Sequence, residues 1–230
     1  MQAKEIESQL KELIAIASCI EPALAYRLDQ IRRWIKDIKP GSLTQKKVLM
    51  DFLLELIYDA QFWLDLKILT PEEREAFFHQ IAPTTRYWYE DLFYKWFSER
   101  DRKFYTWKQK LRSGEFDRED AEIVNSIASQ IQSCEGTIVY RYVADLSMAT
   151  DAIVSSPTGQ PLCVQLTSMS DRFAQNKYEQ WEKTLREWGI ERGIFVSYNP
   201  GGDDFILKLV NVVLYNSKNL PAQKYLKFSF

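Results

Sequence analysis

The spacing of the apolar residues changes near Gly114, and this change most constrains what the chain can fold into. Before it, apolar residues recur three and four positions apart, which is the period of helices buried along one side. After it, short runs rich in β-branched and aromatic residues alternate with helical stretches. We therefore expect an all-helical region over residues 1–114 and an α/β domain over residues 115–230, an α+β chain overall.

Proline and turn residues divide the helical region. Thr70 followed by Pro71 and two glutamates is a strong helix start, because threonine caps, proline suits the first helical position and acids suit the N-terminus. Pro22 marks another start. One long helix is expected over about residues 84–111.

The α/β region reads as a helix, three strands, a second helix and a fourth strand, followed by a further helix and an edge strand. The first three strands suggest a meander, and the second helix a crossover to the fourth strand. In chain order, the expected elements are a helix over 118–133, strands over 137–142, 150–155 and 161–167, a helix over 168–188, a strand over 193–198, a helix to about 215 and an edge strand over 224–230.

The composition favours a cytoplasmic protein without a metal framework of cysteines or histidines. There is no apolar run of about 18 residues to cross a membrane and no basic, apolar leader. The three cysteines are too few for a disulfide framework or a zinc site. The single histidine, His79, is interpreted as structural.

A net charge of −2 argues against binding of nucleic acid by bulk charge, so any such binding requires a local patch. Residues 86–112 hold eight basic and four acidic residues, a net charge of +4. The aromatic residues of 86–107 could stack on bases, but their helical spacing favours core packing. A third possibility is an interaction module that presents these aromatics as one exposed patch.

The turn between the second and third strands places polar residues together. If residues 156–160 form the loop, paired positions sum to 316 and Asp151 lies opposite Gln165. Thr167 is on the same face, because side chains alternate along a strand. Asp151 could still be only a strand-start residue and Gln165 only a buried amide with structural partners.

These residues resemble the PD-(D/E)XK, or restriction-endonuclease-like, nuclease superfamily over about residues 115–199. The likeness rests on Thr150-Asp151, on Val164-Gln165-Leu166-Thr167 and on the αβββαβ order with a mixed sheet. It implies a Mg²⁺ (or Mn²⁺) site held by Asp151, Gln165 and the carbonyl of Leu166, and hydrolysis of nucleic acid, DNA being the expected substrate.

The chain departs from the family at Thr167, where the family has a catalytic lysine. Either Lys177, on the following helix, has taken its place, or the site is inactive and the fold serves as a nucleic-acid- or protein-binding subunit. The resemblance also suggests a helical acid, with Glu122 as the candidate and Glu119 in reserve. The helical region could hold DNA, a second copy of the chain or another protein.

Overall fold

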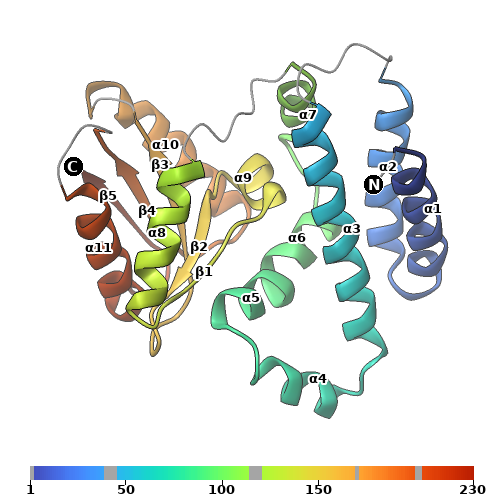
Figure 1. Cartoon of the computed structure of the whole chain (residues 1–230), viewed down its shortest axis with the longest axis horizontal. Coiled ribbons are helices and arrows are strands. Elements are labelled where there is room, and N and C mark those ends of the chain that lie inside the picture. Colours follow the sequence, from blue (N-terminus) through green and yellow to red (C-terminus); the bar gives the residue numbers. More distant parts are fainter. Residues whose placement is uncertain (1–2, 39–45, 114–120, 169–170, 200–203) are drawn as a thin grey trace. The chain divides into compact units, whose positions relative to one another are not determined.

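The computed structural model describes residues 3–38, 46–113, 121–168, 171–199 and 204–230 (Figure 1). A helical N-terminal half is followed by a mixed five-stranded sheet interleaved with helices, as predicted. The chain forms two compact units, Met1–Ile81 with Asp91–Asp117, and Ala82–Glu90 with Arg118–Phe230.

The first unit is built from helices whose starts follow the sequence signals. Pro22 opens α2, and at Thr70 the side chain accepts from the amide of Glu73 while the Glu73 carboxylate accepts from the amide of Thr70, a complete capping box. The helices of this unit are α1 (Ala3–Ile20), α2 (Pro22–Lys36), α3 (Lys46–Ile68), α4 (Pro71–Phe78), α6 (Phe93–Ser98) and α7 (Phe104–Ser113).

The prediction of one long helix over residues 84–111 is wrong. The segment consists of α5 (Pro83–Tyr87), a π-helical turn η1 (Trp88–Leu92), α6 and α7, with a break after Ser98. At the break the Asp101 carboxylate accepts from the backbone N–H of Lys103 and from the indole Nε1 of Trp107, both at 2.8 Å. An aspartate that bonds its own backbone two residues on competes with the helical ladder, which explains the break.

The aromatic residues of 86–107 are mostly buried. Trp88, Tyr89, Phe93, Trp96, Phe97 and Trp107 are all at most 3% exposed. Tyr94 and Tyr105 are 44% and 71% exposed. The segment therefore does not present the contiguous aromatic patch that a docking module of this kind requires, and the core interpretation is confirmed.

The sheet of the second unit has the order β1-β2-β3-β4-β5. β1 (Thr137–Val139), β2 (Ala152–Ser155) and β3 (Leu162–Thr167) form the predicted antiparallel meander. α10 (Asp171–Glu187) then leads to β4 (Arg192–Ser197), which is parallel to β3, and β5 (Lys224–Ser229) is parallel to β4 at the edge.

The first predicted strand is too long. β1 ends at Val139, and a short helix, α9 (Tyr142–Met148), follows instead of a strand to Tyr142. Ala149 ends α9 in the left-handed conformation with φ 52°, and the carbonyl of Ser147 accepts from the indole of Trp188. Trp188 is distant in sequence, so local strand propensity does not reveal its contact with Ser147.

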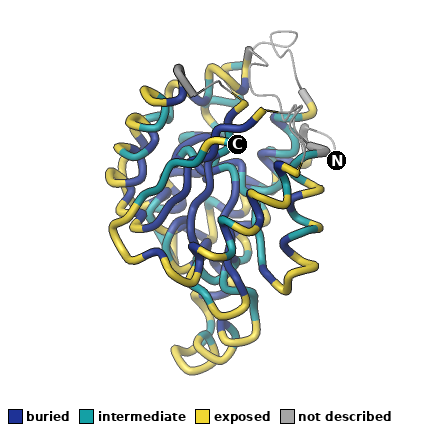
Figure 2. Tube along the Cα trace, turned by 90° about the vertical axis from the view of Figure 1, so that its left-hand side faces the viewer, coloured by how far each residue is buried: buried dark blue, intermediate teal, exposed yellow. Residues whose placement is uncertain are grey.

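Helices cover both faces of the sheet. α8 (Ala121–Ser133) and α11 (Phe205–Asn219) lie side by side and pack on the face that carries Val154, Val164 and Val196 (Figure 1). α10 covers the opposite face, where Trp181 packs on Phe195. The central strands are buried almost throughout, as Figure 2 shows. The face under α10 is the one to which Asp151, Gln165 and Thr167 belong.

Arg192 anchors the β2–β3 hairpin at its turn. Its guanidinium is buried and donates to the carbonyls of Gln160, Asn216 and Ser217 at 2.8–3.0 Å. Burial lowers the pKa of Arg192, but an arginine starts so far above neutrality that it keeps its charge. One cation therefore joins the hairpin turn to the C-terminal carbonyls of α11, where a positive charge is favoured.

Replacement of Arg192 by methionine should weaken this anchor. We expect Arg192→Met to lower the free energy of unfolding by about 2–3 kcal/mol, since several buried carbonyls lose a charged donor. The urea midpoint and the amide exchange of residues 152–167 measure this. Arg186→Met, which removes an exposed arginine paired with Glu182, is the control and should leave the urea midpoint nearly unchanged. Equal effects of the two changes would contradict the anchoring role.

Candidate functional site

The pairing of β2 with β3 places Asp151 beside Gln165. The observed partners are Ala152 with Val164, Ile153 with Cys163 and Val154 with Leu162, so the predicted register is confirmed. The amide of Asp151 donates to the carbonyl of Val164 at 2.9 Å, which carries the ladder one residue further. Gln165 Nε2 lies 2.5 Å from Asp151 Oδ2.

The Asp151 carboxylate is held by two donors from β3. Besides the Gln165 amide, the backbone N–H of Leu166 donates to Oδ2 at 2.6 Å. Gln165 Nε2 also donates to the carbonyl of Leu166 at 3.0 Å. Gln165 is only 8% exposed, so these bonds satisfy an amide that burial would otherwise penalise. The acid, the amide and the carbonyl of Leu166 therefore converge at the end of the hairpin.

Lys177 of α10 reaches the same strand end. Its Nζ donates to Thr167 Oγ1 at 3.0 Å, and Thr167 is two residues from Gln165 on the same face of β3. The structure thus places an amine at the Thr167 side chain. Hydrogen bonds link Asp151, Gln165 and Leu166 at one end of β3, and Lys177 bonds the next residue of that strand, Thr167.

The donor set suits a hard divalent cation. The Asp151 carboxylate, the Gln165 side-chain oxygen and the Leu166 carbonyl are all oxygen ligands, and Mg²⁺ often uses one or two carboxylates with water and substrate phosphates. Within the described part of the chain, no group of three or more His, Cys, Asp or Glu residues could hold a metal. A magnesium site here would use one protein carboxylate and would require the Gln165 amide to turn, because its Nε2 faces Asp151 Oδ2 and the Leu166 carbonyl in the structure.

The contacts described above do not test the helical acid that the resemblance suggests. Glu122 lies in α8, which packs on the opposite face of the sheet from α10, and its side chain is outside the described residues. Glu119 also falls outside the described residues. The assignment of Glu122 to the site stays a prediction.

Gln175 and Tyr178 of α10 lie along the sheet toward β5 rather than beside Asp151. Gln175 Nε2 donates to Glu179, and the Tyr178 hydroxyl donates to the carbonyl of Tyr225 at 3.4 Å. Burial raises the pKa of Tyr178, and the negative charge of Glu182 raises it further. The Tyr178 ring also packs edge-on against Phe195 of β4.

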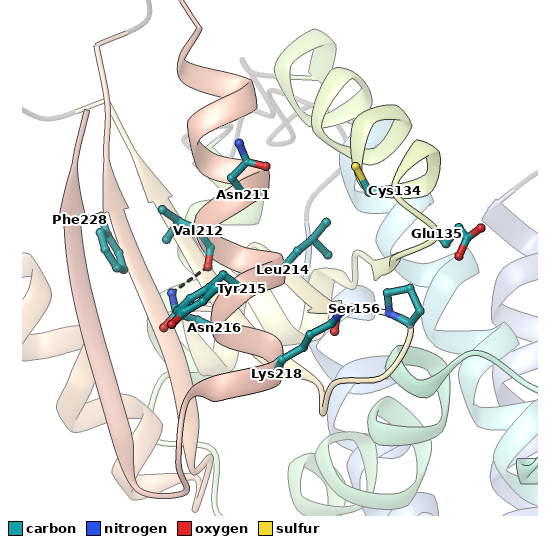
Figure 3. Close-up of a pocket in the computed structure, with 11 residues that line it drawn as sticks. Cys134, Glu135, Ser156, Asn211, Val212, Leu214, Tyr215, Asn216, Lys218 and Phe228 are labelled. Atoms are coloured by element: carbon teal, nitrogen blue, oxygen red, sulfur yellow. Dashed lines mark hydrogen bonds between the residues drawn. The ribbon is translucent and has the colours of Figure 1, made fainter.

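A pocket of about 930 Å³ lies elsewhere in the same unit (Figure 3). Residues around α11 line it, among them Asn211, Tyr215 and Lys218, together with Ser156 at the hairpin turn. In Figure 3 Phe228 lies on one side of α11, and Cys134 and Glu135 lie on the other. Ser156 follows β2 and Asp151 precedes it, so the pocket is at the opposite end of that strand and includes none of the converging polar groups.

Comparison of the chain with protein-family models, with curated proteins and with solved structures gave no match. None of the helices in the described ranges has the length and apolar character needed to cross a membrane. The case for the site therefore rests on its own geometry.

A charge change at Gln165 tests whether the pair is a metal site. Gln165→Glu puts a second carboxylate against Asp151, so we expect a lower melting temperature without metal and a larger stabilisation by Mn²⁺ than in the unchanged chain. Thermal unfolding with and without MnCl₂ measures both effects. Gln175→Glu, on the exposed side of α10, is the matched control and should not alter the metal response. If Gln165→Glu destabilises the protein equally with and without Mn²⁺, the pair has only a structural role.

Proposed function

We propose that the chain is a divergent nuclease of the PD-(D/E)XK kind that hydrolyses phosphodiester bonds of nucleic acid, DNA being the expected substrate, with Mg²⁺ or Mn²⁺. The contact of Lys177 Nζ with Thr167 Oγ1, next to the Asp151–Gln165 pair, is the observation that carries the proposal. The strand order and the parallel pairing of β3 with β4 agree with what the resemblance implies.

Each residue then has a distinct role. Asp151, the Gln165 oxygen and the Leu166 carbonyl would hold the cation. When bound, the cation polarises the scissile phosphate and lowers the pKa of the attacking water. Lys177 orients that water and stabilises negative charge on the phosphate. Thr167 holds the lysine amine toward the strand end and so positions it.

The burial of Lys177 is consistent with such a role. The side chain is half-buried, and an ammonium group removed from water is costly unless it is paired or hydrogen-bonded. The neighbouring face of α10 carries apolar groups such as Trp181 and Leu185. Among the described residues, the amine has one hydrogen bond, to Thr167, and a phosphate bound at the strand end would give its charge an ionic partner.

The alternative is a nuclease fold that binds nucleic acid or protein without cutting. It is favoured by the amide at Gln165, because the bond from Nε2 to Asp151 closes the acid without any cation. Ion pairs inside the basic segment 86–112 neutralise part of its positive charge, which weakens its attraction for nucleic acid. Arg86 pairs with Glu90 at 2.6 Å and Lys95 with Asp91 at 3.7 Å.

Moving the lysine back to the strand distinguishes the two functions. We expect purified chain with Mg²⁺ or Mn²⁺ to cut DNA, and Asp151→Asn and Lys177→Met each to lower the rate by at least about 10²-fold. The double change Thr167→Lys with Lys177→Met should recover part of the loss, since the amine returns to the family's position. Lys183→Met, an exposed lysine of α10, is the control and should keep full activity.

The nuclease and the binding subunit predict different results. Absence of cutting on DNA and RNA with either metal, in folded protein, would overturn the nuclease and support the binding subunit. Cutting that persists in Asp151→Asn would show a contaminating enzyme or a different site.

A further inference from the structure

A row of hydroxyl groups crosses the carboxyl ends of the three parallel strands. Thr167 of β3 is the register partner of Ser197 of β4, and Ser197 is the partner of Ser229 of β5. Register partners share a face, so all three lie on the face that α10 covers. Ser197 Oγ and Ser229 Oγ are 2.7 Å apart, and Thr167 Oγ1 accepts from Lys177. Thr167 and Ser197 are buried and Ser229 is exposed, so the row starts at the candidate site and is open to a ligand only at its β5 end.

A second lysine stands beside this row on the edge strand. Lys227 is two residues from Ser229, and it is in register with Phe195 and, beyond it, Gln165. Its Nζ donates to Gln175 Oε1 of α10 at 3.3 Å, which fixes it on the α10 face. With strands about 4.8 Å apart, the backbones of Lys227 and Gln165 are separated by about 10 Å. That distance is within reach of the phosphates next to the scissile one.

We propose that Lys227 and Ser229 bind a backbone phosphate flanking the scissile phosphodiester, so that the nucleic acid strand runs from Asp151 across the ends of β3, β4 and β5. This inference rests on the proposed function for the identity of the ligand. An ammonium and a hydroxyl are ordinary donors to phosphate oxygens, and such contacts set register without reading sequence. Ligands of open α/β sheets bind outside the carboxyl ends of the strands, which is where this row lies.

A competing explanation is that lysines on β5 only protect an edge strand from pairing with another chain. Lys224, on the same strand, provides the comparison. It pairs in register with Arg192 at the other end of β4, and its side chain points to the α11 face because it is an odd number of residues from Lys227. Edge protection predicts equal roles for the two lysines, whereas phosphate binding predicts a role for Lys227 alone.

The test is binding of DNA by the full chain in an Asp151→Asn background, with Ca²⁺ and a short fluorescent duplex, followed by anisotropy over a range of salt. We expect Lys227→Ala to raise the Kd roughly fivefold and to reduce the slope of log K against log salt by about 1. Ser229→Ala should raise the Kd less. Lys224→Ala should leave both quantities unchanged, and circular dichroism checks that all variants fold.

Three results would overturn the phosphate site. The Lys227→Ala variant could bind DNA as tightly as the background variant, or Lys224→Ala could weaken binding equally. The third is that the background variant binds no DNA. Cutting by the unmodified chain is assayed separately, so loss of the Lys227 effect alone leaves the proposed nuclease standing. Conversely, Lys227-dependent binding by a chain that never cuts supports Lys227 as a phosphate contact, but overturns both the nuclease and the flanking position of that phosphate.

Discussion

The register of the β2–β3 hairpin is the constraint on which the candidate site depends. A slip of one residue would turn Asp151 and Gln165 to opposite faces, since side chains alternate along a strand. Two features hold the register: the apolar residues Val154 and Val164 fill one face, and Arg192 ties the turn to α11 at the other end. The polar pair is thus positioned by packing and by a buried cation that lie away from it.

Much of the fold could be predicted because its signals are local. The turn residues 156–160 and the alternation on either side of them were enough to predict the pairing that the structure shows. The capping box at Thr70 is local in the same way. Prediction failed in two places. α9 replaces the end of a strand, where Ser147 contacts the distant Trp188. The local bonds of Asp101 to Lys103 and Trp107 accompany the break in the expected long helix.

The candidate site, too, could be predicted only in part. Asp151, Gln165 and Thr167 follow from strand spacing, and Lys177 from the face of one helix. The reach of Lys177 to Thr167 needs the packing of α10 on the sheet and could not be read from spacing alone. Lys227 was missed, although the alternation of Tyr225, Lys227 and Ser229 in the last strand would have placed them on one face. Its place near the candidate site follows only from the parallel pairing of β5 with β4.

The most direct measurement of the central claim is a crystal structure of the chain grown with Mn²⁺, located by its anomalous signal. The account predicts a peak bound by the Asp151 carboxylate, the Gln165 side-chain oxygen and the Leu166 carbonyl, with the Lys177 amine facing it from α10. A peak elsewhere, or an empty site in which Gln165 still donates to Asp151 while Lys177 points to solvent, would contradict it.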